Sequence, residues 1–216
     1  MLVRFSCFLI WFLFSAIFQD SPPNEEGSFL AADLVELSNT NKGFKLDIRY
    51  ASKNNFTGKA IYAEGRAFLQ RPAAEALVRV QKKANEFGFG LLIYDAYRPW
   101  SVTKVFWNDF PEFRPYLSNP AKGSRHNRGC AVDLSFFDLK SGEPIDMPSG
   151  YDEFTERAHP DYSGGSVESR RHRDLLRNLM ESEGFSVYEN EWWHFDYKNW
   201  KEYKVLNIEF SKIDMR

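Results

Sequence analysis

The sequence predicts an α+β domain in which helices flank a central antiparallel sheet. Strand-like and helical patterns are mixed along the 216 residues without the regular alternation that is typical of a parallel sheet. Two strand-like segments near the C-terminus are joined by a tight connection through Glu189 and Asn190, which indicates an antiparallel pair. The sequence shows no internal repeat and no low-complexity tract. These observations favour one domain of mixed helices and strands.

Three segments repeat apolar residues at helical spacing. They cover residues 72–87, 101–110 and 167–183, and the last has the clearest apolar face. Ser101 and Ser166 stand at the start of two of these segments. Serine side chains accept hydrogen bonds from the free N–H groups of a first helical turn, so we expect both residues to act as caps.

Short apolar or alternating segments predict the strands. They span residues 46–50, 91–94, 131–137, 185–188 and 193–197. The first of them alternates between apolar and polar residues, while the second is a continuous apolar run. The polar stretch 140–143, which contains a glycine, is expected to be a turn.

The N-terminal segment differs from the rest of the chain. Arg4 precedes an apolar run, Phe5–Phe18, that is short for a membrane span and typical of a signal-peptide core. We therefore expect residues 1–18 to be a signal peptide or an N-terminal membrane anchor, 19–28 a linker, and 29–216 the folded domain. The prediction is an exported protein, periplasmic or membrane-tethered, with membrane contact only through the apolar run; a cytoplasmic location is the alternative.

The composition is that of a globular protein and sets limits on its partners. A net charge of −2 gives no electrostatic footprint for nucleic acid. Aromatic residues reach 17%, which indicates a bulky core. Of the two cysteines, Cys7 lies in the apolar run, so the folded domain has one thiol and no internal disulfide. That thiol, Cys130, is expected to fill a small buried space.

Two short motifs carry candidate metal ligands. His126 and Asp133 lie in the first, and Glu191 and His194 lie in the second. Two imidazoles and one carboxylate would leave a fourth position open for water, which is the arrangement of a catalytic zinc site, and the second carboxylate could act as a base. The alternatives are a loop histidine paired with a surface aspartate, and a core histidine with satisfied hydrogen bonds.

The positions of two further charged residues lead to expectations that a structure can check. Glu191 and His194 would face opposite sides of an ideal strand, so Glu191 should lie in a turn or beside a bulge. Arg98 follows the predicted strand 91–94, where an arginine can stabilise negative charge on an oxyanion. The alternative for Arg98 is a surface salt bridge with Asp95.

The motifs Ser-x-His-x-x-Gly-x-Ala-x-Asp and Glu-x-x-His resemble those of the zinc D-alanyl-D-alanine dipeptidases, the VanX-like branch of the M15 peptidases. Further segments agree in order between residues 30 and 197, and they are Tyr50–Ala51, Asn55–Gly58, Asp95–Pro99, Tyr151–Phe154 and Glu156–His159. The two metal motifs alone would indicate only the wider superfamily, which includes carboxypeptidases and the hedgehog signalling domain. The further segments favour the dipeptidase branch.

The resemblance implies a role for each matching residue. His126, Asp133 and His194 would bind one zinc ion per chain. Glu191 would act as the general base and then as the acid, and Arg98 would stabilise the tetrahedral intermediate.

The resemblance also implies how the substrate is held. Asp152 would bind its ammonium group and Ser124 would help to bind it. Two positions depart from the pattern without touching a ligand, because Ala96 replaces an expected glycine and Cys130 replaces a small residue such as serine.

The activity implied is hydrolysis of the free dipeptide D-alanyl-D-alanine to two D-alanines. The alternative enzyme is a murein D,D-carboxypeptidase or endopeptidase that acts on longer cell-wall peptides, which an exported location would favour. A different class is a metal-bearing binding domain without catalysis, against which Glu191 and Arg98 both argue.

Overall fold

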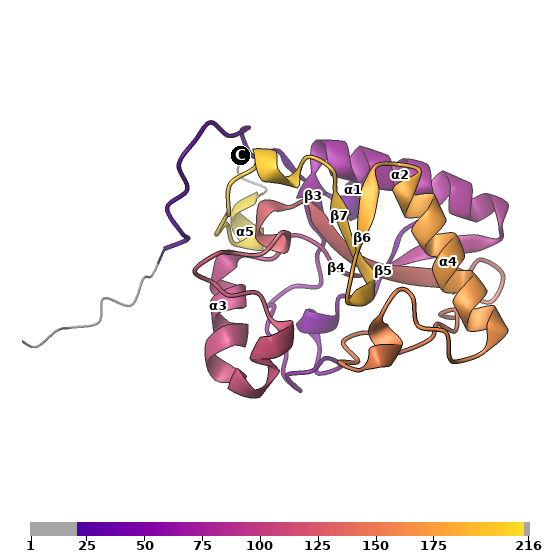
Figure 1. The fold of residues 1–216 in the computed structure, drawn as a ribbon. Coiled ribbons are helices and arrows are strands. Elements are labelled where there is room, and N and C mark those ends of the chain that lie inside the picture. Colours follow the sequence, from indigo (N-terminus) through magenta and orange to yellow (C-terminus); the bar gives the residue numbers. More distant parts are fainter. Residues whose placement is uncertain (1–20, 214–216) are drawn as a thin grey trace, which may run out of the picture.

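The computed structural model describes residues 21–213, which form two β-sheets with helices packed around them (Figure 1). The larger sheet has five strands in the order β2-β4-β5-β7-β6. These strands are β2 (Lys45–Leu46), β4 (Phe89–Asp95), β5 (Ala131–Asp138), β7 (Glu191–Tyr197) and β6 (Phe185–Tyr188). The smaller sheet pairs β1 (Leu34–Glu36) with β3 (Phe68–Gln70).

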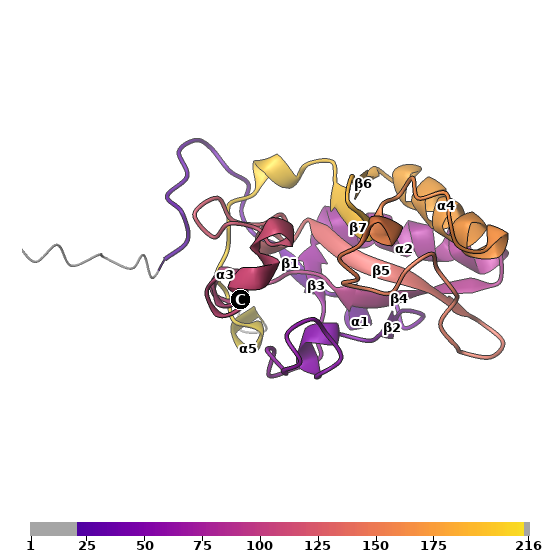
Figure 2. The same cartoon turned by 60° about the horizontal axis from the view of Figure 1, so that its bottom comes forward.

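The helices confirm the mixed α+β class. They are α1 (Leu37–Thr40), α2 (Arg71–Glu86), α3 (Trp100–Asp109), α4 (Val167–Glu181) and α5 (Phe210–Ile213). The two longest, α2 and α4, contact each other and lie along the same side of the larger sheet (Figures 1 and 2). The predicted helices 72–87, 101–110 and 167–183 correspond to α2, α3 and α4.

The two predicted caps have different outcomes. Ser166 caps α4, because its side chain accepts a hydrogen bond from the Ser169 N–H. Ser101 does not cap α3, so that prediction is wrong. The helix begins one residue earlier at Trp100, and the Ser101 N–H donates instead to Asn207 Oδ1 at 2.9 Å. A residue distant in sequence thus takes the place of a local cap.

The larger sheet is antiparallel except at one edge. β4, β5, β7 and β6 pair antiparallel in turn, whereas the two-residue strand β2 pairs parallel with β4. The predicted strand 46–50 is wrong beyond Leu46, because the chain forms a 3₁₀ turn at Arg49–Ala51. Ile48 and Tyr50 are both buried, so their alternating apolar pattern reflects burial in a turn rather than a strand.

The hydrophobic core lies between the larger sheet and the helices α2 and α4. Leu77 and Val80 of α2 and Leu176 and Met180 of α4 have no exposed surface, and neither has Phe136 of β5. Each fully buried side chain of this size contributes about 1.5–3 kcal/mol to folding. This packing fixes the position of the sheet on which the candidate site is built.

Side-chain alternation on β5 places the candidate site on the opposite face of the sheet. Phe136 stacks on Phe89, and Phe89 makes an edge contact with His172 of α4. Val132, Leu134 and Phe136 therefore face the helices, and Asp133 points to the other side. The buried helical face and the polar site thus share one strand without interfering with each other.

The segment expected as a linker is partly tied to the domain. Residues 21–28 form no helix or strand, but the Glu25 carboxylate pairs with Arg128 and accepts a hydrogen bond from Val205 N–H at 2.7 Å. The predicted signal peptide or anchor, residues 1–18, lies outside the described residues. Among residues 21–213, every helix is too short or too polar to cross a membrane.

Candidate metal centre and active site

The loop that carries His126 is held by hydrogen bonds from its own side chains. Ser124 Oγ accepts from the His126 N–H at 3.2 Å, and Asn127 Oδ1 accepts from the Ser124 N–H at 2.7 Å. The 3₁₀ turn His126–Arg128 ends at Gly129, whose φ of 71° and ψ of 23° lie in the left-handed region. Gly129 turns the chain into β5, and this brings His126 back toward Asp133.

Asp133 and His194 come together because their strands pair in register. Asp133 of β5 and His194 of β7 are direct partners in the antiparallel ladder. Directly opposite residues point to the same face and have Cβ atoms about 4.5–5.5 Å apart. The sheet therefore brings together two ligand candidates that are 61 residues apart, from 133 to 194.

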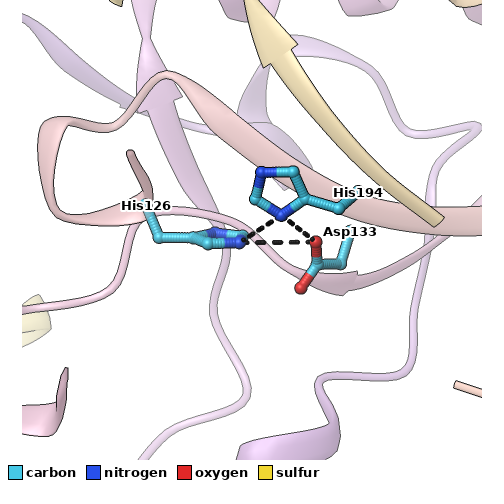
Figure 3. Close-up of side chains that lie close together, drawn as sticks. All are labelled: His126, Asp133 and His194. Atoms are coloured by element: carbon cyan, nitrogen blue, oxygen red, sulfur yellow. Dashed lines mark hydrogen bonds and ion pairs between the residues drawn. The ribbon is translucent and has the colours of Figure 1, made fainter. Parts of the chain in front are cut away.

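Three ligand atoms converge on one point (Figure 3). His126 Nε2 and His194 Nδ1 lie 3.1 Å apart, and they lie 3.3 Å and 3.0 Å from Asp133 Oδ1. Ligands at about 2.0–2.1 Å from a tetrahedral zinc ion would be about 3.3–3.4 Å apart. The observed spacing is therefore close to three corners of a tetrahedron.

The buried oxygen at the centre of this cluster also fits a cation. Asp133 Oδ1 has no conventional hydrogen-bond partner among the described residues, although it is buried. A buried polar atom without a partner is costly, so the site has the character of one completed by a metal ion. The convergence expected from the sequence is thus present; that the three side chains bind metal stays a prediction.

Each candidate ligand is held from behind by a second group. His126 Nδ1 lies 2.7 Å from the Ala96 carbonyl oxygen, and His194 Nε2 lies 3.0 Å from Asp196 Oδ1. Both partners are acceptors, so these ring nitrogens carry the protons and the other nitrogens face the cluster. Asp133 Oδ2 accepts a hydrogen bond from Tyr151 Oη at 2.9 Å.

The electrostatics of the cluster favour an ionised Asp133. Burial acts against ionisation, but His126 and His194 outweigh it and hold the pKa of Asp133 well below its usual range. Burial likewise opposes protonation of His194, yet the Asp196 and Asp133 carboxylates raise its pKa well above the usual value. A divalent cation could replace the additional proton that His194 attracts.

Glu191 lies where the sequence required it to lie. It is the first residue of β7, directly after the turn, and the β6–β7 register shifts between Val187 and Tyr188. This irregularity re-aims the side chain, so that Glu191 Oε2 is 3.8 Å from His194 Nδ1. Burial, and to a smaller extent the Asp133 charge, raises the pKa of Glu191 to about 7, against the opposing effect of His194.

Arg98 combines the two readings that the sequence left open. It pairs with Asp95 through Nε at 3.0 Å and Nη2 at 2.7 Å, but the pair is buried rather than on the surface. The guanidinium lies over the rings of Tyr50 and Phe106, 5.1 and 5.0 Å from their centroids. Arg98 also lines the cavity, so its ion pair fixes the guanidinium beside the cluster.

The substrate residues implied by the resemblance face the same space. A cavity of about 510 Å³ is lined by the three candidate ligands together with Glu191, Arg98, Ser124 and Asp152. Asp152 has a φ of 56°, which is uncommon for a residue other than glycine. Its Oδ2 accepts a hydrogen bond from Tyr50 Oη at 3.0 Å.

Asp152 is the carboxylate of this cavity that lacks a cationic partner among residues 21–213. Burial, followed by the charges of Asp133 and Glu191, raises its pKa well above the usual value. A positively charged ligand group beside Asp152 would lower that pKa and stabilise the carboxylate.

Sequence reasoning missed a chain of hydroxyl groups and one carboxylate. Tyr151 Oη contacts Asp133 Oδ2 and lies 3.3 Å from Tyr50 Oη, which reaches Asp152. Tyr50 and Tyr151 matched the family's sequence pattern, but the pattern gave no role for their hydroxyl groups. The contacts of these hydroxyl groups depend on tertiary structure. Asp196 had a usable signal, because it follows His194 by two residues on a strand and must share its face.

Comparison with known proteins identifies the family. The chain matches, over residues 30–213, the M15 peptidase family model described as D-ala-D-ala dipeptidase. The chain belongs to this family. It is therefore a metal-dependent peptidase, and the His126, Asp133 and His194 cluster is its candidate metal centre.

Two relatives show how far the similarity extends. The chain is 36% identical over 179 residues to the D-alanyl-D-alanine dipeptidase of Escherichia coli K12, which covers 83% of this chain and 92% of the relative. It is 34% identical over 172 residues to that of Enterococcus faecium, with 71% and 85% covered. Among solved structures, the vancomycin-resistance D,D-pentapeptidase VanY, determined with Zn(II), shares 14% identity at a TM-score of 0.40, covering 62% of this chain and 75% of that one.

The loop geometry predicts a specific effect of adding one methyl group at Gly129. A Cβ there would lie 2.5 Å from Leu34 Cδ2 and 3.4 Å from the Gln70 backbone nitrogen. We expect Gly129→Ala to cost about 1–2 kcal/mol from the left-handed backbone and about 1–3 kcal/mol more from the clash. It should also weaken zinc binding, because the turn carries His126.

Gly142→Ala is the matched control for this substitution. Gly142 has a φ of 75° and no atom within 4 Å of an added Cβ, so it keeps the backbone cost without the clash. Denaturant unfolding and zinc titration of both variants would separate the two effects. Equal losses in the two variants, with zinc affinity unchanged, would contradict this account of the loop.

Proposed function

We propose that this chain hydrolyses free D-alanyl-D-alanine to two D-alanines, with one zinc ion per chain bound by His126, Asp133 and His194. The observation that carries the proposal is the shared cavity, in which the three-ligand cluster faces Glu191 and Arg98 and also meets an uncompensated Asp152. The names of the relatives from Escherichia coli and Enterococcus faecium support the same dipeptide as substrate.

The donor set fits zinc. Two imidazole nitrogens and one carboxylate oxygen at near-tetrahedral spacing are the usual ligands of a catalytic zinc site. A bound zinc ion would supply Lewis acidity, which polarises the scissile carbonyl and acidifies water. The remaining work of the reaction falls to the side chains around the cavity.

In this proposal Glu191 moves the proton. Its carboxylate lines the cavity beside the cluster, with Oε2 3.8 Å from His194 Nδ1, which supports a contact with a water bound at the metal position. A buried carboxylate with a raised pKa can accept the proton from that water and return it to the leaving amine. The same Glu191 carboxylate would take the proton from the water and later give it to the leaving amine, so a second base would not be needed.

Arg98 is placed to stabilise the oxyanion. Asp95 engages Nε and Nη2, which leaves Nη1 of the guanidinium for a ligand in the cavity. Tyr62 Oη donates to the other oxygen of Asp95 at 2.8 Å, so the ion pair is itself fixed in place. A fixed cation beside the reacting carbonyl stabilises developing negative charge without reorganising in the reaction.

Asp152 favours the dipeptide over longer wall peptides. A free dipeptide brings an ammonium group, which is the cation that this buried carboxylate lacks. In a longer wall peptide the same position would be a neutral amide, and the carboxylate would stay uncompensated. The murein carboxypeptidase or endopeptidase activity is therefore the less favoured function.

Variants of three residues should separate metal binding from chemistry. Glu191→Ala should keep its zinc and lose about 10²–10⁴-fold in turnover of D-alanyl-D-alanine, because proton transfer is removed. Arg98→Ala should also keep zinc and lose about 10²–10³-fold. His126→Ala should lose metal and activity together. The measurements are zinc content and the rate of D-alanine release for each purified variant.

A Glu191→Ala protein that hydrolyses the dipeptide at close to the wild-type rate would remove the proposed base and, with it, this mechanism. Removing zinc from the wild-type protein with a chelator and adding it back provides the reference for full loss and recovery.

The role of Asp152 predicts a dependence on the free amino group. Wild-type protein should hydrolyse D-alanyl-D-alanine far faster than its N-acetyl derivative. Asp152→Ala should lose on the order of 10²-fold in kcat/KM for the free dipeptide, since a charged hydrogen bond contributes about 1.5–3 kcal/mol. Its activity on the N-acetyl dipeptide should change little.

Asp161→Ala, at an aspartate whose side chain is 93% exposed, is the control for removing a carboxylate. If Asp152→Ala lowers the rates for both substrates by the same factor, the residue does not recognise the ammonium group.

We also propose that the folded domain lies outside the cytoplasmic membrane, released or tethered by its N-terminal segment. The support is Arg4 followed by the apolar run Phe5–Phe18. Fractionation of cells that express the full chain should recover the domain outside the cytoplasm, and deletion of residues 2–18 should retain it inside. Full-length soluble protein in the cytoplasm would contradict the proposal.

A further inference from the structure

The two histidines of the cluster present opposite ring nitrogens to it. His126 uses Nε2 and is held through Nδ1, whereas His194 uses Nδ1 and is held through Nε2. Their partners also differ, because Ala96 offers a neutral backbone carbonyl and Asp196 offers a carboxylate. Although the contact to Ala96 is the shorter one, at 2.7 Å against 3.0 Å, a charged acceptor generally makes the stronger hydrogen bond.

Asp196 is fixed at both of its oxygens. Oδ1 lies 3.0 Å from His194 Nε2, and Oδ2 lies 2.8 Å from Arg125 Nη1. Asp196 follows His194 by two residues on β7, so both side chains stand on the same face of the sheet. His194 and Asp196 are both buried, which shields the contact between them from competing water, whereas the Arg125 side chain is 36% exposed.

Arg125 connects this pair to the other half of the centre. It directly precedes His126 in the chain, and its guanidinium lies over Tyr188 and Trp200, 5.5 and 5.0 Å from their ring centroids. The Arg125–Asp196 ion pair therefore joins the loop of one candidate ligand to the strand of another. This ion pair involves none of the three ligand atoms that face the candidate metal position.

From this geometry we infer that Asp196, held by Arg125, is a positioning residue for the metal. It keeps the proton of His194 on Nε2, so that the Nδ1 lone pair points to the centre of the cluster. The inference rests on the proposed zinc site, but it concerns how His194 is presented and not which substrate is hydrolysed. Partners of metal-bound histidines typically contribute about 10–100-fold to metal affinity.

Zinc affinity is the first test of this role. Competition with a chelator should show that Asp196→Ala raises the zinc dissociation constant about 10–100-fold. Asp196→Asn should raise it less, because its amide oxygen can still accept from His194 Nε2. Asp174→Ala is the matched control, since Asp174 pairs with Arg173 at 2.8 Å on α4, away from the cluster, and it should bind zinc like the wild-type protein.

The second test observes the proton directly. In zinc-loaded wild-type protein with ¹⁵N-labelled histidine, NMR should show His194 protonated at Nε2 and His126 protonated at Nδ1. In Asp196→Ala the His194 Nε2–H signal should shift and exchange faster with water, while the His126 signal stays unchanged. Asp196→Asn should retain the His194 signal. If Asp196→Ala does not fold, the zinc dissociation constant and the NMR spectrum are measured on Asp196→Asn instead.

Two results would overturn the inference. One is a zinc dissociation constant within twofold of wild type for both Asp196 variants. The other is a wild-type spectrum in which zinc-bound His194 carries its proton on Nδ1. A wild-type protein that binds zinc but leaves D-alanyl-D-alanine intact would remove the proposed substrate, while the affinity and NMR comparisons would still decide the role of Asp196.

Discussion

The register between β5 and β7 is the constraint on which the centre depends. Asp133 and His194 are useful only because they stand directly opposite each other. A slip of one residue would turn one of them to the other face of the sheet. Trp192 and Trp193 point to opposite faces of the sheet and are only 2% and 1% exposed. A slip would move these rings out of their buried sites, so their packing opposes it. These two buried rings thus help to keep the candidate ligands Asp133 and His194 opposite each other.

Three carboxylates line the cavity without an ion pair to an arginine or lysine among residues 21–213, and they are Asp133, Asp152 and Glu191. Lys122 also lines the cavity, while the lining arginines are engaged by other carboxylates: Arg98 by Asp95, Arg125 by Asp196 and Arg128 by Glu25. Burial and the charges of neighbouring carboxylates raise the pKa values of Asp152 and Glu191. A cation bound beside them would lower these pKa values and stabilise the ionised carboxylates. A divalent metal and a substrate ammonium group would supply that charge at two separate points. In the proposed function, the metal and the substrate would therefore bind by supplying the positive charge that these buried carboxylates lack.

Local patterns in the sequence were enough to predict α2, α4 and the β6–β7 hairpin, because each depends on periodicity and neighbouring turn residues. The conflict between strand alternation and the need for Glu191 near His194 also predicted a real irregularity. The same reasoning failed beyond Leu46 and at Ser101, where burial and a contact with Asn207 decide the local structure. These contacts join residues far apart in the chain, and no spacing rule contains them.

The site residues divide along the same line. Motif spacing led to the three candidate ligands, and the structure shows that they converge. For Arg98 the sequence left two interpretations open, an oxyanion-stabilising residue and a surface salt bridge with Asp95. The choice between them depends on burial, which only the fold provides. The hydroxyl chain from Tyr151 through Tyr50 to Asp152 had no signal in spacing at all. Contacts of that kind depend on how two distant segments meet, the turn that carries Tyr50 and the loop that carries Tyr151 and Asp152.

Two residues with positive φ meet different requirements of the site. Gly129 and Asp152 both have left-handed φ values, 71° and 56°. At Gly129 an added Cβ would lie 2.5 Å from Leu34 Cδ2, so that side chain would have to move, and the left-handed turn itself favours glycine. At Asp152 the cavity requires a carboxylate, and aspartate is among the few residues that adopt this conformation at modest cost. A strain of about 1–3 kcal/mol at Asp152 is tolerable because Tyr50 holds the carboxylate in place. Glycine at that position would relieve the strain and remove the group that the site needs.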